Sequence, residues 1–395
     1  MEPKLRFSEF NSNWTHDNLE NVAEIFDGTH QTPLYTKTGV QFVSVENIED
    51  IYKSEKYISH EEYDKYKNKP QINDILMTRI TAGVIGETAM VTKDVPLAYY
   101  VSLALIRCEK LFPSYVEKYI HSIQFRKELY KRIIHTAFPK KINLGDIGKC
   151  LVGITNEQEQ QKIAEFLSTI DIVITKQKET VSAWEERKKG VMQKLFSQEV
   201  RFKADDGSDF PEWEEKKIDD LFYKVNERNN GQFGKDKWIS VAKMYYQDED
   251  KVTSNNIDTR TYVMRVGDMS FEGHPNKEFK YGRFVVNDIG DGIISELFPI
   301  YRHKENYILK YWKYAIQVDS IMQKIYRKSI TSSGASSNKL DDDDFKRQSI
   351  LVPCLAEQQK IADCLSSLDE VIETQKATLA AWEELKKGLL QQMFV

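Results

Sequence analysis

Residues 159–197 read EQQKIAEFLSTIDIVITKQKETVSAWEERKKGVMQKLFS, and residues 357–395 give a second version, EQQKIADCLSSLDEVIETQKATLAAWEELKKGLLQQMFV. The two copies align without a gap, and about 23 of their 39 positions are identical. A repeat of this length predicts one structural element that occurs twice, each time after a longer and more variable stretch of chain.

Apolar residues in each copy follow alternating steps of four and three, the heptad pattern of helices that pack along their length. Each copy corresponds to a helix of roughly 58 Å, and we expect the two helices to pair as an antiparallel coiled coil. Lys188 and Lys386 fall within the apolar frame, where a buried polar side chain fixes register. The alternative is two ordinary amphipathic helices in separate cores. The predicted seam comprises Ile163, Leu167, Ile170, Ile174, Trp184, Ile361, Leu365, Leu368, Ile372 and Trp382.

The composition is that of a globular protein with more than one domain. The chain has 395 residues, with 41% hydrophobic and 30% charged side chains, which predicts two or three domains. We find no apolar run long enough to span a bilayer, and no signal peptide in MEPKLRFSEF. The four cysteines show neither disulfide nor zinc spacing, so we expect a cytoplasmic protein that makes no membrane contact.

A weaker repeat covers the stretches ahead of the two helical copies. Trp14 corresponds to Trp213, and Ile72–Leu76 corresponds to Val266–Ser270 as a turn that leads into a strand. The predicted fold class is therefore α+β, with two mixed α/β domains alternating with two long helices. We expect the first domain at 1–156, the first helical spacer at 157–197, the second domain at 198–354 and the second spacer at 355–395.

Within each domain, strand-like runs precede one helical stretch. The first domain shows strand patterns over 39–45, 75–80, 84–91 and 101–107, and a helix from Ser114 to about His135. The second shows strand patterns over 238–241, 262–266, 282–286 and 292–301, and a helix from about Leu309 to Arg327. The middles of the two domains share little sequence, which favours one scaffold that presents two different surfaces.

Local charge indicates nucleic acid, although the net charge of −5 does not. Residues 118–141 contain seven Lys or Arg side chains and one Glu, and residues 324–339 contain four basic side chains and no acid. Each basic segment lies shortly before its long helix. A solvated helix face would explain either segment alone, but their recurrence favours a surface that faces a polyanion.

Motifs for catalysis are missing from the sequence. There is no GxxxxGK[ST] phosphate loop, no Gly-rich dinucleotide or S-adenosylmethionine motif and no Asn/Asp-Pro-Pro-aromatic motif of adenine methyltransferases. The seven histidines lack metal-ligand spacing, and the run Asp341–Asp344 is more consistent with a solvated turn than with a metal site. We therefore expect a chain without catalytic residues, bound cofactor or metal.

Short motifs mark both halves of the chain. They are Asp27–His30, Thr32-Pro33, Gly39–Val43, Asp74–Arg79, Ile142–Leu144 and Glu159–Ala164 in the first half, and Gly282-Arg283 and Glu357–Ala362 in the second. With these motifs, the sequence resembles the specificity subunit of type I restriction-modification systems. The resemblance covers essentially the whole chain. Two departures from the family pattern are the acidic run Asp341–Asp344 before the second spacer and the absence from the first spacer of a proline matching Pro353.

The resemblance implies a non-catalytic subunit that reads double-stranded DNA. Two different domains on a coiled-coil ruler would read a split, asymmetric site. The implied partners are two modification subunits, which use S-adenosylmethionine to methylate adenine at N6, and restriction subunits, which use ATP and Mg. The alternative is a non-catalytic coiled-coil scaffold that holds two protein-binding domains. A methyltransferase gene next to this one would favour the first reading.

Base reading requires side chains with paired donors and acceptors, or contacts to the thymine methyl group. The candidates in the first domain are Thr29, His30, Gln31, Arg79, Thr81, Tyr99 and Tyr100, with Lys140, Lys141 and Asn143 near the backbone. The candidates in the second domain are Arg228, Asn229, Asn230, Lys243, Asn276, Lys277, Tyr281 and Arg283, with Ser332, Ser333, Asn338 and Lys339 as phosphate contacts.

Overall fold

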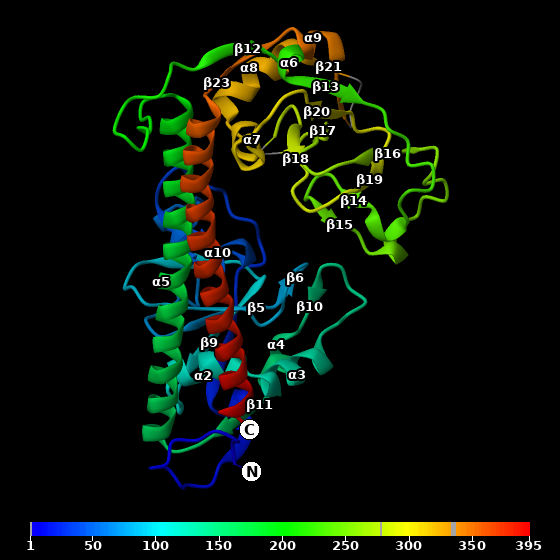
Figure 1. The fold of residues 1–395 in the computed structure, drawn as a ribbon. Helices are drawn as coiled ribbons and strands as arrows, with labels where there is room; N and C mark the ends of the chain where they lie inside the picture. Colours follow the sequence, from blue (N-terminus) through cyan, green and yellow to red (C-terminus); the bar gives the residue numbers. More distant parts are fainter. Residues whose placement is uncertain (1, 277–278, 333–336) are drawn as a thin grey trace. The chain divides into compact units, whose positions relative to one another are not determined.

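The computed structural model describes residues 2–276, 279–332 and 337–395. It divides into two compact units, the first formed by Met1–Glu179 with Lys376–Val395 and the second by Thr180–Gln375. Helix α5 (Glu157–Phe196) and helix α10 (Leu355–Gln392) each contribute one part to each unit. Each unit therefore combines a globular α/β part with one segment of both long helices (Figure 1).

The first unit is built on a four-stranded antiparallel sheet in the order β2-β9-β5-β7. Its strands are β2 (Ala23–Asp27), β9 (Leu103–Cys108), β5 (Ile75–Thr78) and β7 (Thr88–Met90). Around it lie the pairs β1 (Thr15–Asn18) with β11 (Leu151–Ile154) and β6 (Ile80–Thr81) with β10 (Lys140–Lys141), and the sheet of β3 (Val40–Val43), β4 (Tyr57–Ile58) and β8 (Leu97–Tyr99). Its short helices are α1 (His60–Asp64), α2 (Pro113–Ile120), α3 (Ile123–Arg132) and α4 (Leu144–Gly148).

The second unit repeats this sheet in the order β13-β20-β17-β18. Its strands are β13 (Phe222–Val225), β20 (Ile300–His303), β17 (Met269–Glu272) and β18 (Arg283–Val286). The remaining strand pairs are β12 (Glu214–Lys217) with β23 (Ser349–Val352), β14 (Ile239–Ser240) with β15 (Tyr245–Tyr246), β16 (Thr261–Met264) with β19 (Gly292–Ser295), and β21 (Ile330–Ser332) with β22 (Asn338–Leu340). Its short helices are α6 (Ile218–Leu221), α7 (Leu309–Ala315), α8 (Asp319–Ser329) and α9 (Asp342–Lys346).

Strand β5 is buried on both faces because a separate core covers each side of its sheet. Ile75 and Met77 belong to a cluster that includes Tyr115 of α2, whereas Leu76 packs with Val43 of β3. Alternate residues of a strand point to opposite faces, so one strand serves two cores. The main sheet is therefore a middle layer between helices and a smaller sheet.

The turn before the central strand is the same in both units. Asn73 has φ 73° and Gly267 has φ 89°, values in the left-handed region. Glycine adopts this region freely, and asparagine adopts it more readily than most residues do. The predicted correspondence of these two turns is confirmed.

The residue after each turn anchors an arginine of the neighbouring strand. Asp74 accepts hydrogen bonds at 2.9 and 2.6 Å from the guanidinium of Arg107, and Asp268 accepts them at 2.7 and 2.8 Å from Arg302. The hydrogen bonds to Asp74 raise the pKa of Arg107. Two-pronged pairs of this kind add geometric specificity as well as stabilisation, and so help to fix the register of neighbouring strands. The two sheets therefore share the same ion pair as well as the same strand order.

The expectation of one helix per domain between the last strand and the spacer is wrong. In place of the one predicted helix, the first unit has the two helices α2 and α3, and the second unit has α7 and α8. The Ser122 side chain accepts a hydrogen bond at 3.2 Å from the backbone of Phe125 and starts α3 as an N-cap. Neither proline nor glycine marks this break. The apolar pattern of the sequence therefore continues across it and predicts one helix.

In the first unit, the start of α5 packs against the end of α10. Ile163, Leu167 and Ile170 share one buried cluster with Leu389 and Met393. The helices are therefore antiparallel, as predicted (Figure 1).

In the second unit, the end of α5 packs against the start of α10, where Leu195 and Phe196 share a cluster with Ile361 and Leu365. The two predicted tryptophans, Trp184 and Trp382, are only half-buried. They lie at the edge of the seam, whereas the branched aliphatic residues fill its centre.

The two lysines in the apolar frame form equivalent ion pairs. Lys188 of α5 lies 2.6 Å from Asp369 of α10, and Lys386 of α10 lies 2.5 Å from Asp171 of α5. The same pair thus occurs in each unit with the roles of the helices exchanged. A paired charge holds one register, because a shift of the helices would leave it without its partner.

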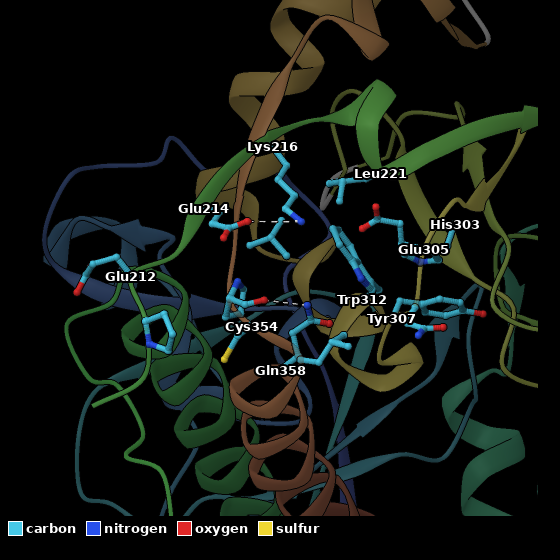
Figure 2. A pocket seen from close by; sticks show the side chains of 15 residues that line it. Glu212, Glu214, Lys216, Leu221, His303, Glu305, Tyr307, Trp312, Cys354 and Gln358 are labelled. Carbon is cyan, nitrogen blue, oxygen red and sulfur yellow. Dashed lines mark hydrogen bonds and ion pairs between the residues drawn. The ribbon is translucent and has the colours of Figure 1, made fainter. Parts of the chain in front are cut away.

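A buried Glu-Gln pair joins each long helix to its globular part. In the first unit, Arg6 donates to both carboxylate oxygens of Glu159, at 2.7 and 2.8 Å. In the second unit, Arg201 donates to Glu357 at 3.1 and 2.9 Å. The Gln358 amide nitrogen donates to the Pro353 carbonyl at 2.9 Å, at the wall of a pocket of about 670 Å³ (Figure 2).

Candidate nucleic-acid interface

Asp27, at the end of β2, organises the candidate surface of the first unit. Its Oδ2 lies 2.8 Å from His30 Nε2 and its Oδ1 lies 3.2 Å from Arg79 Nη2. Its backbone carbonyl accepts a hydrogen bond from the Tyr99 hydroxyl at 3.0 Å. Two predicted side chains, His30 and Arg79, therefore meet at one carboxylate, and a third, Tyr99, binds the backbone carbonyl of the same residue.

The stretch after Asp27 presses against the end of β8. A Cβ atom on Gly28 would lie 2.5 Å from the carbonyl carbon and oxygen of Tyr100, so only glycine permits this approach. Thr29 then pairs with Tyr100 in a parallel bridge, and its amide donates to the Tyr99 carbonyl at 3.2 Å. Thr29 and Tyr100 are half-buried, whereas Gln31 is exposed.

A two-residue ladder joins this group to the predicted phosphate contacts. Lys140 pairs with Thr81, and Lys141 pairs with Ile80. The backbone amide of Ile142 donates to the Arg79 carbonyl at 3.0 Å. Lys140 and Lys141 are exposed and have no ion-pair partner among the residues that the structure describes. Their ammonium groups are therefore available to an external anion.

Two predicted contacts of the first unit prove to be internal. Arg79 is 7% exposed, and its side chain donates to the carbonyls of Val101 and Ile142. Tyr99 is 3% exposed. Burial raises the pKa of the Tyr99 hydroxyl. These side chains position the surface and do not reach a ligand as they stand. Asn143 is exposed and donates to Asp146 at 3.0 Å.

The basic segment 118–141 is less available than its composition suggests. Lys118 is buried in ion pairs with Glu117 and Asp171, and Arg126 pairs with Glu87. Lys131 and Arg132 both pair with Glu128, at 2.6 and 2.7 Å. Few basic side chains of this segment are therefore available to a polyanion, and those that are lie chiefly at the end of the segment. In the second unit Lys324, Arg327 and Lys328 of α8 remain exposed.

In the second unit, several candidates gather around the β17–β18 hairpin. Arg283 donates to the carbonyl of Ala242, the residue before the exposed Lys243. The Asn338 side chain donates to the Lys280 carbonyl at 3.4 Å, and its backbone amide donates to the carbonyl of Gly273 at 2.8 Å. Strand β22 therefore attaches to the end of β17 as the segment after β10 attaches to the end of β5.

Other candidates of this unit are also placed. Asn276 and Lys339 are exposed, and Tyr281 is half-buried. Lys277 and Ser333 lie outside the described residues, as does the side chain of Ser332.

A second group in this unit is mostly engaged internally. Arg228 lies 2.5 Å from Glu296 and donates to the Thr259 carbonyl at 2.6 Å. The hydrogen bond from Arg228 lowers the pKa of Glu296, as does a second one from Arg260. Asn229 is fully buried and is therefore no longer a candidate for contact with DNA. Asn230 is exposed, and its backbone has φ 44°.

A pocket of about 440 Å³ links the two groups of the second unit. Its lining includes Glu296 and Tyr262 from the Arg228 side and Asn338 and Lys339 from β22. It also includes His274, which lies 2.6 Å from Glu272 and was not predicted.

The structure also exposes apolar residues that sequence reasoning missed. They are Leu34, Phe138 and Leu297, and each lies in a loop at or near a proline. A large apolar residue in a proline-marked loop is a signal that was available in the sequence.

Comparison with known proteins agrees with this duplicated plan. The family model described as the type I restriction modification DNA specificity domain matches residues 11–182 and again residues 211–383. The chain belongs to this family. Each half of the specificity protein thus carries one copy of the same domain, as the paired sheets show. Members of the family are DNA-recognition subunits without catalytic activity of their own, as expected from the sequence.

Two solved structures share the fold of this specificity protein. The crystal structure of a type I restriction-modification system S subunit from M. genitalium is 15% identical, covers 100% of this chain and 99% of that chain, and gives a TM-score of 0.56. A chain from a study of complex assembly and conformational transition of the type I R-M system is 12% identical, covers 95% and 96%, and gives 0.57. At these identities, the likeness shows the fold alone.

The residues that the structure describes contain neither a metal-binding cluster nor a membrane-spanning helix. No three His, Cys, Asp or Glu side chains gather there as a metal site. No helix there has the length and apolar character needed to cross a bilayer.

Proposed function

We propose that this chain reads a split and asymmetric DNA site, with one domain for each half-site. The observation that carries the proposal is a duplicated frame with different exposed side chains. The ion pairs Asp74–Arg107 and Asp268–Arg302 repeat in the two sheets. The side chains offered beside the central strands differ, with Thr81 and Lys140 in one unit and Lys243 and Asn276 in the other.

The proposed reading follows the donor and acceptor pattern of the major groove. Amides such as Gln31 and Asn276 can pair with adenine, and Arg283 can pair with guanine. Lysines hold phosphates and set the register of the protein on the duplex. The proposed contacts are Thr29, His30, Gln31, Thr81, Tyr100, Lys140, Lys141, Asn143, Arg228, Asn230, Lys243, Asn276, Tyr281, Arg283, Asn338 and Lys339.

The proposed partners are two modification subunits and the restriction subunits. The modification subunits would bring S-adenosylmethionine and methylate adenine at N6, and the restriction subunits would use ATP and Mg. The family match supports this assignment. In this proposal, the domains at 1–156 and 198–354 read the bases. The helical spacers set the distance between the half-sites and serve assembly with the partner subunits.

Variants confined to one unit test the proposal. In complex with its modification subunits, the double variant Gln31→Ala, Thr81→Ala is expected to relax selection in one half-site of a randomised duplex. Lys243→Ala with Asn276→Ala is expected to relax the other half-site. Changes in both half-sites from either variant would contradict the assignment of one domain to each half-site. Complete indifference of the wild type to sequence would favour the scaffold alternative.

A further inference from the structure

The loop between α3 and β10 carries the most exposed aromatic ring near the candidate surface of the first unit. Phe138 is 91% exposed. The loop is closed at its base by the Ile134 amide, which donates to the Lys141 carbonyl at 2.8 Å. It projects from the body of its unit beside β6 and β10 (Figure 1).

The ring is presented on an anchored stem. Lys140, two residues after Phe138, pairs with Thr81. The backbone amide of Ile142 then donates a hydrogen bond to the carbonyl of Arg79. Arg79 is itself held by Asp27, which also contacts His30. The loop therefore extends from the same contact network that carries the proposed base contacts.

Isolated exposed apolar residues are common and need no explanation. Phe138 differs because it is followed closely by two exposed lysines, Lys140 and Lys141. An apolar tip next to cations fits duplex DNA, where the lysines meet phosphates and the ring meets the stacked bases. Proteins that kink DNA insert Phe, Leu or similar side chains between base steps in this way.

We propose that Phe138 enters the base stack of the half-site read by the first domain and partly unstacks one step. The inference rests on the proposed function and deepens it. It makes the two half-sites physically unequal, because the sequence has Ser336 where the first domain has Phe138, if Lys339 is aligned with Lys141. Part of the specificity would then come from how easily one base step deforms.

The test uses the full chain in complex with its modification subunits, bound to its target duplex. The fluorescent adenine analogue 2-aminopurine replaces, one at a time, the adenines in and next to each half-site, and its emission rises where a base loses its stacking neighbour. The target adenines are left unlabelled, because methyltransferases flip their target base out of the stack. We expect a rise at one step of the first half-site, and no such rise in the second. Phe138→Ala should abolish the rise and weaken specific binding by roughly tenfold, whereas Phe138→Trp should retain both.

Ile72→Ala is the matched control, because Ile72 is 50% exposed and lies before β5, at the opposite end from Arg79. It should leave the fluorescence and the affinity unchanged. A Phe138→Ala complex that binds specifically and keeps the fluorescence rise would overturn the inference and leave the proposed function intact. A wild-type complex without sequence preference would overturn both.

Discussion

At the scale of single residues, His303 gives the second unit a predictable response to acid. Its ring stacks on Tyr307 at a centroid distance of 3.7 Å and lies near Trp312 (Figure 2). It also lies near Phe222. Burial lowers its pKa to about 3. An unfolded histidine titrates near pH 6.5. Between these values the unfolded chain binds the extra proton, so stability falls as pH falls from about 6.5 to about 3.

Replacing His303 by phenylalanine should remove this contribution. The free energy of unfolding of His303→Phe is expected to fall less steeply below pH 6.5 than that of the wild type, by up to about 1.4 kcal/mol per pH unit. Urea unfolding at pH 4.5, 5.5 and 7.5, followed by tryptophan fluorescence, measures the difference. Parallel pH profiles for the two proteins would show that His303 is protonated in the folded state.

Lys140 and Lys141 are expected to act on affinity and not on sequence preference. Each lysine that neutralises a phosphate contributes roughly 0.9 to the slope of log K against log salt. Replacing both by glutamine should lower that slope by about 1.8 and weaken all duplexes to a similar extent. Titrations at several salt concentrations measure it. An unchanged slope would place the lysines away from the phosphates.

The sequence predicted the chemistry of the candidate residues better than their availability. The sequence predicts Thr81 and Lys140 as separate candidates, and the structure pairs them. Arg79 and Asn229 are predicted as base contacts because of their donor groups, which the fold uses for internal hydrogen bonds. Burial depends on contacts between distant parts of the chain, such as Arg79 with Ile142, so no local pattern could separate the two groups.

At the scale of elements, the seam predicts large and equivalent losses from truncation in the two units. Leu167 and Leu365 occupy equivalent positions in the repeat and are both fully buried. Leu167→Ala and Leu365→Ala should each lower the free energy of unfolding by about 2–5 kcal/mol. Ile172→Ala, at a position 55% exposed on α5, should change it by less than about 0.5 kcal/mol. Denaturant unfolding measures all three, and equal effects would contradict the observed packing.

The sequence predicted some helices and strands better than others. The long helices were predictable because 4-3 spacing persists through two copies, and the structure gives them as Glu157–Phe196 and Leu355–Gln392. The break between α2 and α3 was missed because Ser122 caps a helix without any proline or glycine. Capping depends on one side-chain hydrogen bond, which periodicity does not reveal.

At the scale of the whole molecule, the duplicated frame was predictable from the sequence. The difference between the surfaces of the two units was predictable only in part. The repeated turn at Asn73 and Gly267 and the repeated ion pairs follow from matched sequence positions. The surface beside them comes from the loops, where the two halves share little sequence. Such surfaces can be located from a common frame, but which bases the proposed contacts would read depends on side-chain placement against DNA.

The most direct measurement is a single-molecule methylome of a strain that carries this gene with the gene of its proposed modification subunit, compared with the same strain lacking only this gene. We predict a split, asymmetric adenine-methylation motif that disappears on deletion. Identical methylomes in strains shown to express both proteins would contradict the proposed role in reading DNA.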